Sequence, residues 1–584
     1  MDQDKPRHWI AVALQLGATG GLAALLISLV GMVEEFAKRF IIVDVLEMGQ
    51  ALLLLILIAT GYMTSRRLAD RPPRIRLLAA VVSGLVPAVM LFALVLLIEP
   101  LNMRSIFPNA SPTLIEILTF GQRGAIAFAM MAVAGAAQAA AGGAVPLVSP
   151  RWRAPIVQGV VWVGLLGLLQ DILRVTLTNI PGATFVLSWM FGGGSGKGLS
   201  ILGAVVIFAL VGYATFRRQG RPAAAASWRS RLDARTARLV NIGIWVAAAV
   251  GLYLLPKLLG PYLSEVTNSV GIFVLMGLGL NIVVGFAGLL DLGYVAFYAI
   301  GAYVVGVLTT TAVGDQAGQI VWGPAMSFWL ALMAAVLVSV MAGIILGVPV
   351  LNMRGDYLAI VTLGFGEIIR IMAGSDFLKP FTGGSQGIVQ VGVGRIGGLV
   401  AFDKPQTIFY VVVAACAAAG FISWRLRDSR MGRTWKALRE DEDVAQAMGI
   451  HLVSTKLLAF ATGAAFAGLA GALFASKIGS IYPHSFKLLV SINVLSLIIV
   501  GGMGSLPGVF IGALALVGLP ELLREFSEYR LLMYGALLIV MMLNRPEGLM
   551  PEATRRRELR ETDGPEAEAP PEGVANPGEV AASG

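Results

Sequence analysis

Long apolar runs recur along most of this 584-residue sequence and restrict its fold more than any other feature. Each is roughly 16 to 24 residues long, which is enough to cross the hydrocarbon core of a bilayer as a helix. Within lipid, only helices satisfy every backbone hydrogen bond of such a run. Charged residues make up 14% of the chain, against about 25% in soluble domains. The sequence therefore predicts an all-α, polytopic bundle of transmembrane helices.

We expect about sixteen spans from the lengths and spacing of the apolar runs. Those expected before residue 217 cover 9–32, 48–64, 77–98, 124–145, 155–173 and 199–216. Those expected after residue 238 cover 239–256, 270–290, 292–311, 326–350, 357–372, 407–423, 456–475, 488–503, 506–523 and 531–543.

Composition divides the chain into four parts. Residues 217–238 are basic and rich in alanine, and they predict a linker between an N-terminal membrane region, 1–216, and a second membrane region, 239–549. Residues 550–584 contain Glu, Pro, Ala and Gly with almost no large apolar side chain. Such a composition is typical of a disordered tail.

Basic residues predict how the spans are oriented. The loop that carries Arg66, Arg67 and Arg71 is cytoplasmic by the positive-inside rule. Alternating the spans then puts five other basic regions on the same side. They are the N-terminus, the 151–153 loop, the 217–238 linker, the 424–456 loop and the tail. We therefore expect both termini to be cytoplasmic.

Motifs for catalysis and metal binding are missing from the sequence. The three histidines stand far apart, and the single cysteine, Cys416, lies in an apolar run. Residues 191–198 resemble a phosphate-binding loop, but Phe191 stands where its first Gly belongs and Gly198 where Ser or Thr belongs. No catalytic residue, metal or bound cofactor is expected. Uphill transport would need an ion gradient or another subunit.

The charged loop 424–456 contains a stretch with the features of a short helix, 434–448, ended by Gly449. Trp435, Leu438, Ala445 and Met448 fall near one face of that helix. Such a helix either docks onto a soluble partner or is a solvated loop helix that contacts nothing. Periodicity alone favours the second interpretation.

Polar residues inside the apolar runs have two interpretations each. Asn281 lies between Gly277 and Gly285 on one helix face, where it either lines a path or bonds a neighbouring helix. Glu367 and Arg370 are three residues apart, where they either line a path or form a charge pair near a helix end. Small residues at 463, 467 and 471 indicate a packing seam.

Several stretches together resemble one family, the branched-chain amino acid permeases of ABC transporters, and its LivM-type subunits in particular. They cover about 270–549 and include 277–303, 355–367, 382–388, 429–433 and 439–450. The last two resemble the loop that couples such permeases to their ATPases. The first six expected spans resemble an N-terminal extension that some LivM-type proteins carry.

The resemblance implies a non-enzymatic membrane subunit of an ATP-driven importer in the bacterial inner membrane. Its partners would be a LivH-type permease, two ATP-binding subunits that use the ATP, and a periplasmic substrate-binding protein. The 434–449 helix would then couple to the ATPase, through residues Arg439, Glu440, Asp441, Glu442, Ala445, Met448 and Gly449. Residues of the substrate path would include Asn281, Thr362 and Glu367.

Other transport functions stay open on the sequence. Related systems carry urea, amides or other small solutes. A less favoured alternative is an ion-coupled secondary transporter with Glu367 as its proton site, for which inverted repeats with broken helices are expected.

Overall fold

The computed structural model describes residues 8–37, 39–178, 182–191, 198–218, 234–314, 320–350, 353, 355–396 and 400–522, with a few positions between 529 and 551. The chain divides into two compact units, Met1–Leu252 and Tyr253–Gly584, and each is described by itself. The expected linker lies largely outside the described residues, as does the tail, so that domain boundary stays a prediction.

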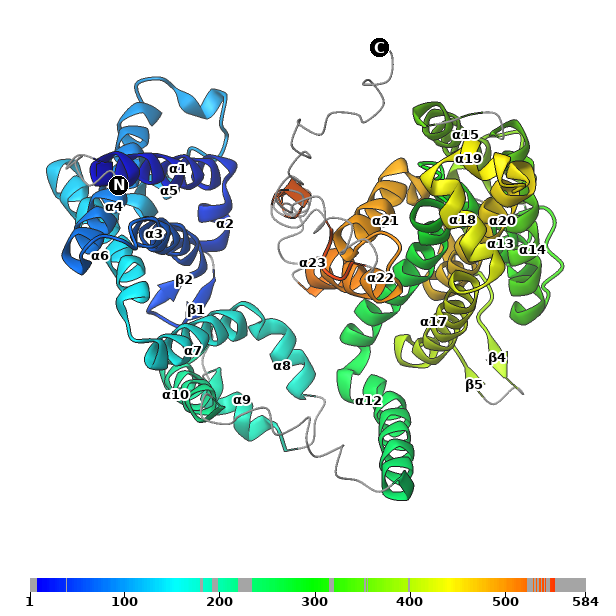
Figure 1. The fold of residues 1–584 in the computed structure, drawn as a ribbon, viewed down its shortest axis with the longest axis horizontal. Helices are drawn as coiled ribbons and strands as arrows, with labels where there is room; N and C mark the ends of the chain where they lie inside the picture. The colour runs from blue at the N-terminus through cyan, green and yellow to red at the C-terminus, as the bar shows by residue number, and fades with distance from the viewer. Residues whose placement is uncertain are drawn as a thin grey trace, which may run out of the picture. The chain divides into compact units, whose positions relative to one another are not determined.

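Four helices form the first part of the N-terminal unit (Figure 1): α1 (His8–Val30), α3 (Met48–Arg67), α4 (Pro73–Ile98) and α6 (Gly124–Ala144). Glycines let them approach closely. A side chain at Gly61 or Gly142 of the α3–α6 pair would collide with a backbone carbonyl of the other helix. Small residues at such contacts are how spanning helices pack without a hydrophobic driving force between them.

A second pair, α7 (Pro150–Leu168) and α10 (Ile201–Arg218), joins this bundle through a short hairpin, β1 (Phe40–Ile42) and β2 (Leu46–Glu47). The Leu199 N–H donates to the carbonyl of Ile41 at 3.0 Å. Between the pair and α3 lies an apolar cavity of about 650 Å³. The remaining short helices of the unit are α2 (Met32–Ala37), η1 (Met103–Ser105), α5 (Pro112–Thr119), η2 (Val145–Leu147), α8 (Gln170–Thr178) and α9 (Thr184–Met190).

Two helices lie at the centre of the C-terminal unit. In the most apolar 18-residue stretch of Val250–Phe286, 72% of the residues are buried, and in that of Leu452–Ile478 67% are, against 22–39% for the other long helices of the described residues. The first comprises the end of α12 (Ala234–Leu280), which kinks at Gly260, and the π-helix η3 (Asn281–Phe286). The second is α20 (Leu452–Ile478).

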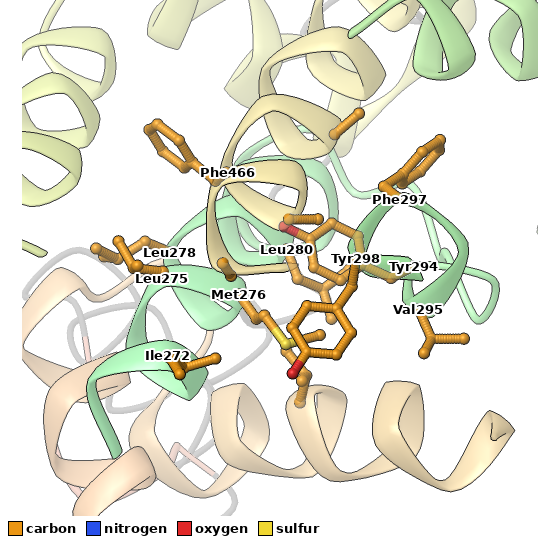
Figure 2. Close-up of a cluster of buried hydrophobic side chains, with 14 of the residues drawn as sticks. Ile272, Leu275, Met276, Leu278, Leu280, Tyr294, Val295, Phe297, Tyr298 and Phe466 are labelled. Carbon is orange, nitrogen blue, oxygen red and sulfur yellow. The ribbon is translucent and has the colours of Figure 1, made fainter. Parts of the chain in front are cut away.

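Helices α13 (Val295–Thr309) and α14 (Phe328–Val350) pack on α20. A side chain at Gly471 would collide with the carbonyl of Tyr298, and Gly463 lies against the carbonyl of Gly279. The predicted packing seam at 463, 467 and 471 is therefore confirmed. Around it, aromatic and aliphatic side chains of α12, α13 and α20 fill the core (Figure 2), among them Leu275, Tyr294, Tyr298 and Phe466.

Short strands form two antiparallel pairs in this unit. β3 (Ile388–Val389) pairs antiparallel with β6 (Ser480–Ile481), and β4 (Arg395–Ile396) with β5 (Val400–Ala401). The unit's other elements are α15 (Asp356–Gly374), α16 (Lys379–Thr382), η4 (Gly384–Gln386), α17 (Pro405–Arg427), α18 (Arg430–Glu440), α19 (Glu442–Ala447), η5 (Pro483–Phe486), α21 (Leu488–Gly501), α22 (Leu506–Ala513), η6 (Leu514–Gly518) and α23 (Leu519–Leu522).

The all-α polytopic fold class is confirmed, although fewer helices qualify as spans than the sixteen expected. Within the described residues, nine helices are long and apolar enough to cross a membrane, or eleven if each bent pair is one span. Helices α10 and α13 are shorter, and α21 and α22 form a pair bent by 120° where two spans were expected. The expected span 531–543 lies mostly outside the described residues.

The contact between α13 and α20 generates a stability prediction. A side chain at Gly301 would collide with the backbone of Gly468, whereas one at Gly420 on α17 would enter open space. We expect Gly301→Leu to lower the unfolding free energy by about 1–3 kcal/mol, the usual cost of overpacking. Thermal unfolding in detergent, with Gly420→Leu as the matched control, measures this. Equal midpoints for the two variants would contradict the close contact.

Candidate functional site

Residues 429–456 are called the coupling segment here, after the role that the resemblance implies. They contain two helices rather than the single 434–448 helix expected from the sequence. Helix α18 ends at Glu440, because Asp441 adopts an extended conformation with φ −158° and ψ 120°. The Asp441 carboxylate then accepts from the N–H groups of Asp443 at 2.8 Å and Val444 at 2.9 Å. This is the geometry of an N-cap, and it starts α19 as a new helix.

Three of the four apolar residues expected on one face are buried. Trp435 is 0% exposed, Leu438 2% and Ala445 3%. The indole N–H of Trp435 donates to the carbonyl of Thr455 at 3.0 Å, which holds α18 against the start of α20. Met448 departs from the expectation, since its side chain is 79% exposed. Met448 follows the last residue of α19 as its C-cap, and it does not share the buried face of Ala445.

An ion pair fixes α19 to α20. The ammonium of Lys456 lies 2.9 Å from a carboxylate oxygen of Glu442, and the two side chains are only 3% and 20% exposed. A charge buried to this extent is tolerated because its partner and hydrogen bonds replace water. Glu442, one of the predicted coupling residues, therefore faces the protein rather than the solvent.

Arg439, a residue of α18 in the coupling segment, contacts η3, which continues the end of α12. Its Nη1 donates to the carbonyl of Gly285 at 2.8 Å, and its Nη2 is 3.0 Å from the carboxylate of Glu440. The aliphatic part of Arg439 packs against Gly288, where any side chain would collide with it. Glu440 is 71% exposed in this arrangement. Periodicity gave no sign of this contact, because Gly285 and Arg439 are distant in sequence.

Val444 and Met448, four residues apart, present an apolar surface outside the membrane spans, with exposures of 59% and 79%. Gly449, at φ 87°, follows α19 and its C-cap Met448 in the left-handed region that favours glycine. Acidic side chains of Glu440 and Asp443 stand in the same stretch and are exposed. Apolar side chains exposed to water on a rigid support are typical of protein-docking surfaces.

The three residues predicted to line a substrate path have different environments. Asn281 is 0% exposed, and its side-chain oxygen accepts from the N–H of Gly504 at 2.8 Å. Thr362 is also 0% exposed, and its hydroxyl accepts from the N–H of Leu292 at 3.1 Å. Glu367 is 43% exposed on α15 and forms an ion pair with Arg370. Of the three, only Glu367 has a side chain at the surface, and their roles stay predictions.

Asp291 is a buried acid that lies between the expected spans 270–290 and 292–311. Its side chain is 1% exposed, in the loop between η3 and α13. One carboxylate oxygen accepts from the N–H of Gly293 at 2.9 Å. Burial raises the pKa of Asp291 to about 7. Within the described part of the chain, no group of three or more His, Cys, Asp or Glu could hold a metal ion.

The Glu442–Lys456 pair predicts how the coupling segment responds to loss of charge. Glu442→Gln removes the carboxylate charge beside a buried ammonium, at a cost of about 1–3 kcal/mol, less than for a fully buried pair. We expect faster hydrogen exchange across α18 and α19, measured by mass spectrometry. Glu440→Gln, at a carboxylate that is 71% exposed, serves as the control. Identical exchange in the two variants would contradict an anchoring role for the pair.

Comparison with known proteins identifies related sequences for this arrangement. Residues 262–542 match the family model described as "Branched-chain amino acid transport system / permease component". The high-affinity branched-chain amino acid permease proteins LivM of Salmonella typhimurium and of Escherichia coli K12 are each 40% identical over 318 residues, covering 51% of this chain and 72% of the relative. The LivH permease protein of E. coli K12 is 33% identical over 148 residues, covering 25% of this chain and 47% of LivH.

No solved structure is significantly similar to the chain. The matched residues contain the whole coupling segment and the central helices of the C-terminal unit after residue 262. Since the relatives of the LivM type are matched over more than two thirds of their length, the chain belongs to the family of branched-chain amino acid transport permeases, of the LivM type.

Proposed function

We propose that this permease is a subunit of an ATP-driven importer for branched-chain or related apolar amino acids, and that the coupling segment is its contact with the ATPase. The observation that carries the proposal is the exposed pair Val444 and Met448. They are held by buried anchors of the same segment, in a chain whose relatives are permeases of such a system. Transport of urea, amides or another small solute by the same machinery is the alternative.

The proposed complex contains this chain, a second permease, two ATP-binding subunits and a periplasmic binding protein. A LivM-type and a LivH-type permease bear the name of the same transport system in E. coli K12, which supports a LivH-type second permease. ATP would be hydrolysed by the ATP-binding subunits, and this chain would bind no cofactor. The proposed location is the bacterial inner membrane, with both termini and the coupling segment in the cytoplasm.

The proposed mechanism is alternating access. Closure of the ATP-binding subunits on ATP would displace the coupling segment, which its anchors to α20 make rigid. Trp435 and the Glu442–Lys456 pair join it to α20, one of the two long described helices with the largest share of buried residues. Movement would therefore reach the spanning helices without being lost in a flexible loop. In this mechanism the chain itself would only change conformation. ATP binding and hydrolysis on another subunit would drive that change.

The substrate path is proposed to run between the two permeases, along α15. A charged pair in a spanning helix is costly when it faces lipid, yet Glu367 and Arg370 are 43% and 30% exposed. The charged pair would avoid this cost if it faced a second permease, or a polar path between the two permeases. An ion-coupled transporter would instead need Glu367 to exchange protons, which its ion pair with Arg370 disfavours.

Lysine substitutions at the exposed apolar residues of the coupling segment test the proposed contact with the ATPase. Val444→Lys with Met448→Lys should abolish co-purification of the ATP-binding subunits from membranes in mild detergent. Both side chains are exposed, so the permease should still fold and insert. The matched control is Phe377→Lys, which adds a charge at an 85% exposed apolar residue between α15 and α16. Retention of the ATPase by the double variant would refute the proposed contact.

Glu367 gives a separate test of the path. We expect Glu367→Gln to lower leucine uptake by about tenfold, with the ATP-binding subunits still bound. The matched control is Glu265→Gln, since Glu265 is 45% exposed and pairs with Lys477 at 2.8 Å on other helices. A similar loss in both variants would mean that the effect is general to such ion pairs. Uptake that persists without ATP and collapses with the ion gradient would favour the ion-coupled alternative.

A further inference from the structure

The end of α12 widens into a π-helix beside the coupling segment. In η3 the hydrogen bonds reach back five residues rather than four, as from the N–H of Ala287 to the carbonyl of Ile282 at 3.1 Å. Gly288, at φ 72°, then turns the chain away. The last carbonyl groups of a helix have no partner within it and need donors from elsewhere. A π-turn also contains one residue more than the α-turn it replaces. Conversion between the two turns would therefore shorten or lengthen the helix.

Arg439 supplies such a donor to η3. Its guanidinium bonds the carbonyl of Gly285, and a cation at this end of a helix also interacts favourably with the helix dipole. On its other side the same guanidinium pairs with Glu440, which is exposed. One side chain therefore connects a residue on the surface of the coupling segment to the backbone of the π-turn.

A third element meets η3 at the same place. The loop between α21 and α22 donates the N–H of Gly504 to the side-chain oxygen of Asn281. Gly285 leaves room for this contact, because a side chain there would collide with the Asn281 oxygen and approach Gly504. The side-chain nitrogen of Asn281 is buried and has no hydrogen-bond partner among the described residues. A buried donor left unsatisfied costs free energy, which a rearranged turn would recover by offering it an acceptor.

We propose that η3 is the joint through which the coupling segment moves the spanning helices, and that Arg439 is the positioning residue that connects the two. The inference rests on the proposed function and adds its internal route. Displacement of α18 pulls on the carbonyl of Gly285. The π-turn then takes up or releases one residue, about 1.5 Å of helix rise. The bond from Asn281 to Gly504 passes the movement to the bent pair α21–α22.

The test uses the complete complex in proteoliposomes, with the binding protein, radiolabelled leucine and ATP. Leucine uptake, ATP hydrolysis and the amount of bound ATPase are measured on the same vesicles. We expect Arg439→Ala to keep its ATPase and hydrolyse ATP, while the leucine imported per ATP falls by about tenfold. Arg439→Lys keeps a donor within reach of Gly285 and should recover most of the ratio. Arg425→Ala, at an exposed arginine of α17, is the control and should match the unchanged chain.

The outcomes separate this inference from the proposed function. An unchanged ratio of leucine to ATP in Arg439→Ala overturns the role of Arg439, while ATPase retention by the unchanged chain upholds the importer. Loss of the ATPase from Arg439→Ala also overturns it, since Arg439 would then act in docking. Failure of Arg439→Lys to exceed Arg439→Ala contradicts transmission through the Gly285 bond. An unchanged chain that retains no ATPase removes the proposed function itself.

Discussion

The C-terminal unit depends on the close packing of α20 against α13 and α14. In a membrane, apolar side chains gain little by leaving lipid for protein, so contact must come from close approach of backbones. Gly468 and Gly471 of α20 make that approach possible, since a side chain at Gly471 would meet the backbone of α13. Because α20 also holds Trp435 and Glu442 of the coupling segment through its first turn, one helix serves both the packing of the unit and its candidate site.

The sequence predicted the parts of this arrangement that depend on local pattern. Apolar runs located most helices, and the spacing of Gly463 and Gly471 located the packing seam. The burial of Trp435, Leu438 and Ala445 followed from helical spacing. Each of these features is set by residues within one segment, where the period of a helix predicts which residues share a face.

The features that the sequence analysis missed arise where two local conformations compete, or where residues far apart in the chain come into contact. Asp441 has helix formers on both sides, but its carboxylate bonds two backbone N–H groups and stops α18. The acidic run Asp441 to Asp443 was a usable signal, since acids are typical of the first turn of a helix. The contact of Arg439 with Gly285 joins residues far apart in the chain and leaves no local pattern. The same holds for the bond between Asn281 and Gly504, which periodicity could describe only as a polar group on a glycine face.

The proposed mechanical connection needs stiffness along its length and compliance at one place, and the coupling segment and η3 would meet these two needs with different chemistry. Burial of an indole and of an ion pair is costly to undo, so these contacts fix α18 and α19 to α20. The contacts of η3 with Arg439 and with Gly504 are single hydrogen bonds, each worth about 0.5–1.5 kcal/mol net. In the proposed mechanism, such bonds would be exchanged within the free energy available from ATP-driven closure. In the proposal, compliance lies in these exchangeable hydrogen bonds, while the buried side chains of Ile282, Val283 and Phe286 keep η3 in the core.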